Sequence, residues 1–185
     1  MKTNLIPTPL EGLAVVEIDY FEDERGFFIE TWNERDFREA GLDVRFLQEN
    51  HSRSAQNVLR GLHYQDMNAP IGKLVRCTTG SIFDVAVDLR ASSPTYGQSH
   101  SVELSAENKK QIWVPVGFAH GFLTLSEFAE VQYKQTEFYA PEFEGGISWD
   151  DPEIGIKWPI SDPVLSSRDT THPSFSEYRK HPAFR

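Results

Sequence analysis

The fold of this chain is decided by the stretch LRGLHYQ at residues 59–65, read together with PVGFAHGF at residues 115–122. Each stretch is a largely apolar, strand-like run that one histidine interrupts, His63 in the first and His120 in the second. A lone histidine in such a strand is usually a core side chain whose ring nitrogens are satisfied by its neighbours. The cluster of Arg60, Gln65 and Lys73 near His63 favours a functional role instead, because polar groups that point into a barrel are costly unless they pair or bind a ligand.

Composition bounds the class of protein. With 185 residues, 39% of them hydrophobic, the chain suffices for one core, so we expect a single domain over residues 1–185. The formal net charge of -10 argues against nucleic-acid binding, which needs many basic residues, although a local basic cluster can still bind an anionic small ligand. The single Cys77, the lack of a signal-peptide core and the lack of a membrane-spanning run predict a cytoplasmic protein with no membrane partner.

Short strand signals recur between clusters of Gly, Pro, Asn and Asp, as is typical of an all-β sandwich or barrel. The clearest covers residues 81–90, where apolar residues alternate with polar ones such as Asp84 and Asp88, as in a half-buried strand. We expect further strands at 14–18, 26–32, 58–65, 73–77, 101–104, 111–114, 121–125 and 129–139. Asn33 as N-cap and Gly41 as stop predict a helix over 34–40, and the tail from about residue 159 is expected to form loops with short helical turns.

The sequence alone leaves open where the side chains of four polar residues point. Arg60 and His63 have opposite parity along their strand, so both face the interior only if Gly61 breaks the pleat. His120 is expected at a turn-flanked position rather than at a strand centre, where it either is structural or hydrogen-bonds a ligand or another site residue. Lys73 either extends outward at the start of its strand or reaches a polar cavity.

The chain contains no phosphate-binding loop, nucleophile elbow or Cys-rich metal motif. Taken alone, Tyr133 and Asp169 are consistent with a core tyrosine and a loop aspartate, and Arg25 and Glu30 with the flanks of an aromatic turn. The residues therefore predict a metal-free barrel whose interior His, Tyr, Lys and Arg side chains serve acid–base chemistry on an anionic ligand, or binding alone.

The spacing Pro-x-Gly-x-x-His at residues 115–120 resembles the second signature of the cupin superfamily, whose members are double-sheet jelly rolls with a ligand inside the barrel. In metal-binding cupins the first signature supplies His-x-His, whereas this chain has Gln65 two residues after His63. One metal ligand is therefore missing, and we expect neither a metal nor another cofactor. The resemblance predicts a mainly β protein, a cupin-type double-stranded jelly-roll barrel with a few short helices.

Nearly the whole chain is similar to one family of that superfamily, the dTDP-4-dehydrorhamnose 3,5-epimerases. The similarity rests on the runs DERGFF (23–28), QENHS (48–52), VLRGLHYQ (58–65), GKLVR (72–76), FDVAVDLR (83–90), SPT (93–95), LSAEN (104–108) and GFAHGF (117–122). The resemblance implies a cofactor-independent epimerisation at C3 and C5 of dTDP-4-dehydro-6-deoxy-D-glucose, which gives dTDP-4-dehydro-L-rhamnose for dTDP-L-rhamnose synthesis. It also implies a homodimer in which the strand around residues 25–30 enters the sheet of the partner and lies beside the partner's nucleotide site.

The resemblance also implies roles for individual residues. His63 matches the catalytic base of the family and Asp169 its carboxylate partner. Tyr133 matches the acid that returns a proton from the opposite face, and Lys73 the contact to the C4 oxygen of the sugar. The positions that match the lining of the nucleotide-sugar site are Arg25, Phe28, Glu30, Gln48, Asn50, Arg60, His120, Glu144 and Arg168. Phe138 replaces a tyrosine found in many members, which keeps an aromatic ring but removes its hydroxyl.

Two other interpretations stay open. A relative that inverts only one carbon would carry the same residue types, because the outcome depends on how long the intermediate stays in the site. A catalytically silent cupin that only binds a nucleotide or sugar would be favoured if His63, Asp169 or Tyr133 were missing, and all three are present.

Overall fold

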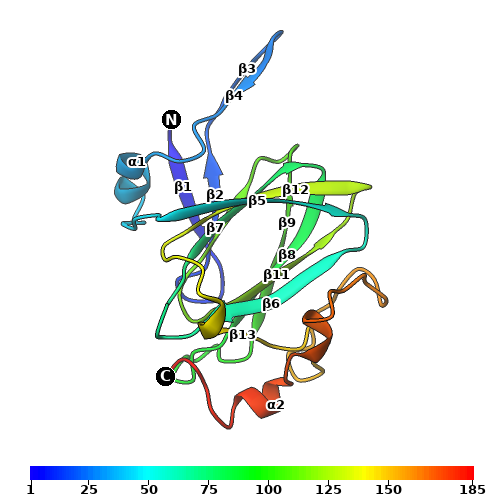
Figure 1. Ribbon diagram of the computed structural model, residues 1–185. Helices are drawn as coiled ribbons and strands as arrows, with labels where there is room; N and C mark the ends of the chain where they lie inside the picture. The colour runs from blue at the N-terminus through cyan, green and yellow to red at the C-terminus, as the bar shows by residue number, and fades with distance from the viewer.

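Two antiparallel sheets make up most of the computed structural model, which describes residues 1–185 (Figure 1). One sheet has six strands in the order β1-β2-β10-β7-β12-β5, the other has five in the order β13-β6-β11-β8-β9, and β3 and β4 form a separate hairpin. The strands are β1 (Thr3–Pro7), β2 (Ala14–Ile18), β3 (Phe21–Asp23), β4 (Gly26–Phe28), β5 (Gln48–Ala55), β6 (Leu59–Gln65), β7 (Lys73–Thr79), β8 (Ser81–Asp88), β9 (Ser99–Ser105), β10 (Gln111–Val114), β11 (Phe118–Thr124), β12 (Phe128–Gln135) and β13 (Glu144–Gly146). The helical segments are α1 (Glu34–Glu39), η1 (Pro141–Phe143), η2 (Asp169–Thr171) and α2 (Phe175–Tyr178). The predicted mainly β jelly-roll barrel with a few short helices is confirmed.

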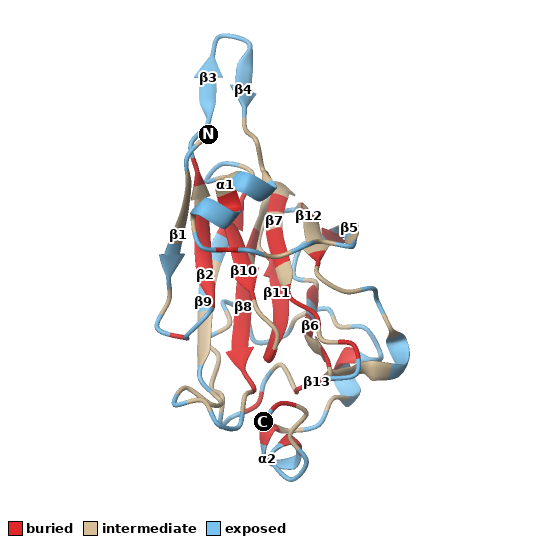
Figure 2. Ribbon diagram, turned by 90° about the vertical axis from the view of Figure 1, so that its left-hand side faces the viewer, coloured by how far each residue is buried: buried red, intermediate tan, exposed pale blue.

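The main core lies between the two sheets. Val75 and Val131 from the six-stranded sheet belong to one buried cluster with Ile82, Leu104 and Phe122 from the five-stranded sheet. Figure 2 shows the buried residues running along the central strands. Full burial of each such side chain contributes roughly 1.5–3 kcal/mol, so this cluster is the main force that holds the sheets face to face.

The six-stranded sheet is covered on its outer face by helix α1. Asn33 caps the helix through its side-chain oxygen, and Gly41 follows the helix with a φ of +104°, as predicted from both residue types. Phe37 is fully buried in a cluster with residues of β2, β7 and β10, and the ring of Trp32 packs against it with a centroid distance of 4.3 Å. This packing also explains why the strand predicted at 26–32 ends at Phe28: Trp32 leaves the sheet to cover the core.

The five-stranded sheet is covered on its outer face by the C-terminal tail, and this corrects the prediction for β8. The alternation predicted there is real, since Val85 and Val87 face the cluster formed with Phe175 and Phe184 of the tail. The opposite face is not exposed, however, because Asp84 has no accessible surface. The interpretation as a half-buried strand was wrong because the tail buries the outer face of the strand while the barrel buries the inner one.

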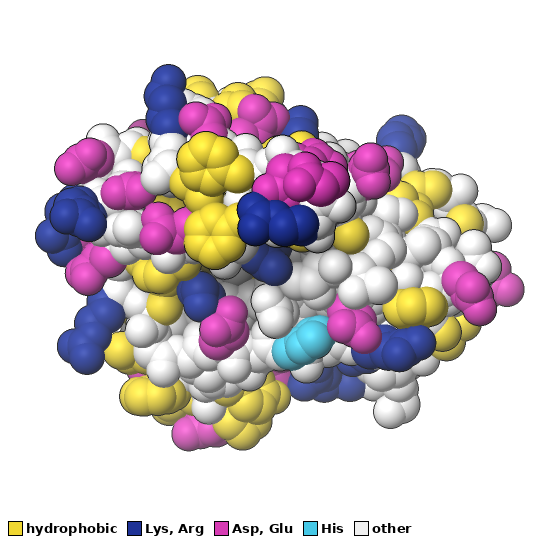
Figure 3. Space-filling view, turned by 90° about the horizontal axis from the view of Figure 1, so that it is seen from above, with side chains coloured by type: hydrophobic (Ala, Val, Ile, Leu, Met, Phe, Trp, Pro, Cys, Tyr) yellow, Lys and Arg dark blue, Asp and Glu magenta, His cyan; other side chains and the backbone are white.

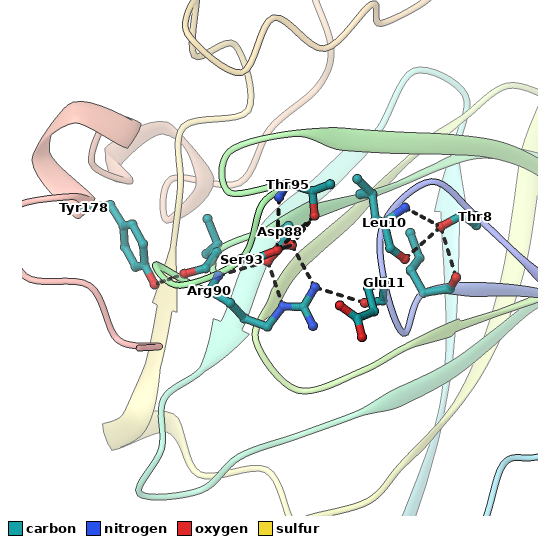
Figure 4. A network of polar contacts seen from close by, with 10 residues as sticks. Thr8, Leu10, Glu11, Asp88, Arg90, Ser93, Thr95 and Tyr178 are labelled. Carbon is teal, nitrogen blue, oxygen red and sulfur yellow. Dashed lines mark hydrogen bonds and ion pairs between the residues drawn. The ribbon is translucent and has the colours of Figure 1, made fainter.

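A network of hydrogen bonds around Asp88 joins the end of β8 to two loops (Figure 4). Asp88 accepts hydrogen bonds from the guanidinium of Arg90 at 2.8 and 2.9 Å and from the hydroxyls of Ser93 at 2.6 Å and Thr95 at 2.7 Å. Arg90 also donates to the carbonyl oxygen of Glu11 at 3.0 Å, in the loop between β1 and β2. One carboxylate thus joins the end of β8 to the following loop and to the N-terminal hairpin.

The other strand predictions differ in detail from the structure. Strands occur as predicted at 14–18 and 111–114, and those at 58–65, 73–77, 81–90, 101–104 and 121–125 have ends shifted by a few residues. The strand predicted at 129–139 ends at Gln135, after which Phe138 and Tyr139 are exposed. Strands β1, β3, β5 and β13 were not predicted, and β5 is the instructive case because its sequence QENHSRSA offers no apolar alternation.

The β3-β4 hairpin projects from the barrel (Figures 1 and 2). Its aromatic side chains are largely exposed, with 71% of Phe21, 57% of Phe27 and 66% of Phe28 accessible to solvent. Seen from above, exposed hydrophobic side chains lie among acidic and basic ones on this end of the molecule (Figure 3). None of the helices is long and apolar enough to span a membrane.

Candidate active site

A cavity of about 830 Å³ is lined by strands of both sheets and by the tail segment 164–169. The predicted site residues that line it are Gln48, Asn50, Arg60, His63, Lys73, His120, Tyr133, Glu144, Arg168 and Asp169. The other three, Arg25, Phe28 and Glu30, lie in or beside the β3-β4 hairpin and do not line the cavity of their own chain. The fold of a single chain therefore brings ten of the predicted site residues together at one cavity, and it leaves the three residues of the hairpin region apart from them.

Arg60 and His63 reach the same cavity because β6 is interrupted at Gly61. Gly61 has a φ of +134°, and a Cβ atom at this position would lie 2.6 Å from the Cα of Gly121 on β11. The pairing register between β6 and β11 shifts at the same point. Only glycine fits this conformation and this close approach, so the predicted break in the pleat is confirmed.

His63 is paired with a buried carboxylate from the tail. Its Nε2 lies 2.5 Å from Oδ1 of Asp169, and Oδ2 of Asp169 accepts a hydrogen bond from the hydroxyl of Ser166 at 2.9 Å. Burial acts to raise the pKa of Asp169, but the interactions with His63 and Ser166 outweigh it and lower the pKa below its ordinary value. A carboxylate acceptor holds the N–H of a neutral imidazole on Nε2, so Nδ1 is the ring nitrogen left to take up a proton.

Tyr133 and Lys73 come from the opposite sheet. Lys73 pairs in register with Gln135 of β12, so it shares a face with Tyr133, two residues along that strand. Burial lowers the pKa of Lys73 to about 8, with Glu144 and Asp84 acting against this shift. Burial raises the pKa of Tyr133, although the nearby Arg60 acts against it. At neutral pH this wall therefore presents a lysine cation next to a protonated phenol.

The mouth of the cavity carries a chain of charged and polar contacts. Glu144 accepts a hydrogen bond from Arg168 at 2.5 Å and one from the hydroxyl of Tyr139 at 2.9 Å. Arg60, which lines the cavity, donates from Nε to the hydroxyl of Ser54 at 2.9 Å and from Nη2 to the carbonyl oxygen of Arg53 at 3.4 Å. Arg60 and Arg168 give an acidic protein a local positive region, as the sequence analysis allowed for.

His120 lies within strand β11, which corrects the prediction of a turn-flanked position. It pairs directly with His63 on β6, and its Nε2 lies 2.9 Å from both carboxylate oxygens of Asp84. The glycines at 117 and 121 suggested a turn, but Gly121 instead permits the close approach of β6, where a Cβ would lie 2.6 Å from the carbonyl oxygen of Arg60. Sequence reasoning placed Asp84 on an exposed face and so missed this pair.

Sequence reasoning also missed Ser166 and His172. Ser166 precedes Asp169 by three residues, a Ser-x-x-Asp spacing in which side chain and backbone can bond each other, and its Oγ does accept from the Asp169 N–H at 3.2 Å. This spacing could have revealed Ser166. Nothing in the sequence around His172 marks it as part of the site.

The side chains of His63, Asp169 and His172 offer ligand atoms within 4.8 Å of one another, so a metal site has to be considered. Two ligands of a tetrahedral zinc ion, each at about 2.0–2.1 Å, lie roughly 3.3 Å apart. The 2.5 Å between Nε2 of His63 and Oδ1 of Asp169 is too short for that and suits a hydrogen bond. The arrangement is that of a histidine–carboxylate pair.

The cavity therefore has a base and a proton donor on opposite walls. His63 belongs to the five-stranded sheet, whereas Tyr133 and the Lys73 cation belong to the six-stranded sheet. A ligand between the walls can lose a proton to one side and regain one from the other, while the cation stabilises the negative charge that forms in between.

Residues 7–177 match the family model described as dTDP-4-dehydrorhamnose 3,5-epimerase. The chain belongs to the dTDP-4-dehydrorhamnose 3,5-epimerase family. It is 54% identical to the dTDP-4-dehydrorhamnose 3,5-epimerase of Salmonella typhimurium over 171 residues, which cover 91% of this chain and 93% of the relative. It is 56% identical to the Pseudomonas aeruginosa enzyme of the same name over 172 residues, 89% of this chain and 94% of the relative.

Solved structures extend these similarities within the 3,5-epimerase family. The epimerase of Legionella pneumophila in complex with dTDP-4-keto-L-rhamnose superposes with a TM-score of 0.89 at 46% identity, covering 93% of this chain and 92% of the other. A 3'-monoepimerase from Streptomyces bikiniensis in complex with dTDP-quinovose also superposes with a TM-score of 0.89, at 33% identity, covering 94% of this chain and 89% of the other. The barrel itself is thus shared by double and single epimerases.

Proposed function

We propose that this protein epimerises dTDP-4-dehydro-6-deoxy-D-glucose at C3 and C5 to dTDP-4-dehydro-L-rhamnose, the step that leads towards dTDP-L-rhamnose. The observation that carries the proposal is the pairing of His63 with Asp169 on one wall of the cavity, with Tyr133 on the other. Identities of 54% and 56% to enzymes named for this reaction support the choice of substrate.

In the proposed mechanism His63 removes a proton from the carbon next to the C4 ketone. The resulting anion delocalises onto the C4 oxygen, where the Lys73 cation stabilises it; one such donor is typically worth about 10²–10³ in rate. Asp169 keeps His63 in the tautomer with a free Nδ1 and stabilises the imidazolium. Tyr133 then returns a proton to the opposite face, and the stereocentre is inverted.

The diphosphate and the nucleotide are assigned to the mouth of the cavity. We propose that Arg60 and Arg168 bind the phosphate oxygens, because guanidinium groups match them with two parallel hydrogen bonds. Glu144 now holds Arg168 and would be displaced or shared when the substrate enters. Gln48, Asn50 and His120 complete the polar lining on the two sheets.

The function is tested by NMR of dTDP-4-dehydro-6-deoxy-D-glucose incubated with the protein in deuterated water. Solvent deuterium at both C3 and C5, with formation of the L-sugar, is the expected result. The similarity to a 3'-monoepimerase makes a single-carbon enzyme the second candidate, and deuterium at one carbon alone would establish it. No exchange at either carbon, with dTDP still bound, would leave a binding protein without this activity.

The role of Tyr133 is tested separately with Tyr133→Phe, which keeps the ring and removes the hydroxyl. Proton abstraction should survive while inversion fails, so we expect deuterium exchange with retained configuration. Epimerisation of both carbons at the wild-type rate would assign the acid to another group.

We further propose that the protein is a homodimer whose sites are completed by the β3-β4 hairpin of the partner. Arg25, Phe28 and Glu30 do not line the cavity of their own chain, and Phe21, Phe27 and Phe28 are exposed on a projecting hairpin. Exposed aromatic side chains of this kind are typical of a contact with another protein surface, and strand exchange between two chains would also cover a sheet edge.

Mixed dimers test this proposal. Inactive His63→Ala chains mixed with inactive Arg25→Ala/Glu30→Ala chains should regain part of the activity, because one of the two sites in a mixed dimer carries no substitution. Each variant incubated alone through the same exchange protocol is the control. No recovery after verified subunit exchange would show that each site is built from one chain.

A further inference from the structure

A second histidine lies behind the pair of His63 and Asp169. His172 follows segment η2, and its Nε2 is 3.5 Å from Oδ1 of Asp169, the same oxygen that lies 2.5 Å from Nε2 of His63. The side chain of His172 is only 11% exposed, and its Nε2 is buried without a hydrogen-bond partner. Its ring meets the ring of His63 edge-on, with a centroid distance of 5.3 Å. One carboxylate oxygen is therefore flanked by two imidazoles.

The backbone is shaped to hold this ring. Gly146 on β13 pairs directly with His63 on β6, and a Cβ atom at Gly146 would lie 2.4 Å from the Cε1 and Nδ1 atoms of His172. The imidazole of His172 therefore occupies the space that any other residue at position 146 would fill. It is fixed between the glycine backbone on one side and Asp169 and His63 on the other.

His172 also lines a second hollow of the surface. The main cavity is lined by His63 and Asp169 but not by His172, whereas a neighbouring cleft of about 470 Å³ is lined by His172 but by neither of the other two. The imidazole thus stands between the carboxylate and the water of this cleft. A carboxylate that is kept from water interacts more strongly with an adjacent imidazolium.

We propose that His172 is a positioning residue of the epimerase site. Its Nε2–H interacts with Oδ1 of Asp169 and holds the carboxylate in place for His63. This inference rests on the proposed function. The buried Nε2 of His172 has no other acceptor, so Asp169 is the group that can satisfy it. Oδ2 of Asp169 is already bonded by Ser166, so a contact from His172 to Oδ1 would fix the carboxylate at both oxygens, and small misplacements of such groups are costly to the rate.

Two substitutions of similar size separate orientation from space filling. His172→Gln keeps an N–H donor near the position of Nε2, whereas His172→Leu fills the space without one. We expect Leu to lower kcat by about 10- to 100-fold with KM and dTDP affinity within about twofold of wild type, and Gln to restore most of kcat. His100→Ala, which removes a part-buried histidine of β9 that does not line the cavity, is the matched control and should leave both constants unchanged.

Gly146→Ala perturbs the same group from the other side and covers the case that His172→Leu does not fold. Its methyl group should push the imidazole away from Asp169 and lower kcat as the Leu variant does, with KM retained. Equal kcat values for the Leu and Gln variants, or a Gly146→Ala enzyme with wild-type kcat, would overturn the proposal. Failure of the proposed function is a different outcome, since the wild-type protein itself would then show no epimerisation.

Discussion

Asp88 and Asp169 are both almost fully buried carboxylates, with 0% and 3% of their surfaces exposed, yet their partners differ in kind. Asp88 is held by the guanidinium of Arg90 and by two hydroxyls, and neither it nor these partners line the cavity. Asp169 is held by a hydroxyl and by His63, whose imidazole lines the cavity.

The two sets of partners fit the two roles that we assign, a structural one for Asp88 and a functional one for Asp169. A permanently charged partner keeps Asp88 in one state at all working pH values, which suits a joint between strand and loops. The partner of Asp169 is an imidazole at the cavity, and in the proposed mechanism this carboxylate stabilises the charge that the imidazole gains. Burial or hydrogen bonding alone does not distinguish the two sites; the chemistry of the partner does.

The largest expected effect is the loss of activity when His63, the partner of Asp169, is replaced. His63→Ala should reduce kcat/KM by about 10²–10⁴-fold, because the general base is lost, while dTDP affinity and the melting temperature stay near those of wild type. Solvent exchange by NMR, dTDP titration and thermal unfolding check the three parts, with the exposed His181→Ala as control. Near-normal turnover of His63→Ala would contradict the assignment.

Substitution of Asp88 should have the opposite effect: it should lower stability and leave ligand binding unchanged. Asp88→Ala leaves the part-buried guanidinium of Arg90 and the hydroxyls of Ser93 and Thr95 without their shared acceptor, and an unsatisfied buried polar group typically costs about 1–3 kcal/mol of the free energy of unfolding. The soluble fraction should bind dTDP normally but melt at a clearly lower temperature. Asp162→Ala, an exposed aspartate of the tail, should change the free energy of unfolding by less than about 0.5 kcal/mol. If Asp88→Ala melted like Asp162→Ala, the network would not act as a joint.

A third test uses pH and concerns the cation that acts with His63. The pKa of Lys73 is lowered to about 8 by burial, so this side chain is charged below that pH and neutral above it. We expect kcat/KM to fall as the pH rises through about 8. In Lys73→Arg the fall should move to higher pH, because a guanidinium stays charged there. Lys134→Arg, on the same strand as Tyr133 but paired with Glu49, is the control and should keep the wild-type profile.

The smallest expected effect is that of chelation. The short distance between His63 and Asp169 leaves no room for a metal between them, so prolonged treatment with a chelator should leave kcat/KM unchanged. Metal analysis of the purified protein accompanies the assay. A stoichiometric metal whose removal abolishes activity and whose return restores it would mean that Asp169 serves as a ligand rather than as an orienting group.

Much of the fold and of the cavity lining could be predicted from the sequence. The β fold, helix α1 and the cavity side chains of β6, β7 and β12 follow from apolar alternation and from the resemblance of whole motifs. Asp84 and Asp88 were misplaced because alternation identifies two faces of a strand but not what covers each one, and here the tail covers the outer face. Strand β5 was not predicted because its side chains are polar on both faces: Gln48, Asn50 and Ser52 line the polar cavity, and the alternate residues are exposed.

Long-range contacts set the remaining limit. His63 and Asp169 are 106 positions apart, and the similarity to known motifs, not the spacing, linked them. His172 belongs to no such motif, and only the folded chain brings it against Gly146 and Asp169. The break at Gly61 was the exception, since a glycine between two polar residues of opposite parity is a local signal.

The placement of Asp169 in the tail has a consequence for how the protein is made. All thirteen strands precede it in the sequence, so during translation the barrel strands leave the ribosome before the carboxylate that orients His63. The pairing of His63 with Asp169 can therefore form only after the last part of the chain has been made. The same segment carries Arg168 at the cavity and Phe175 and Phe184 over the outer face of β8, so a stalled or clipped chain that lacks it would lose the proposed phosphate contact and the cover of the sheet together with the partner of His63.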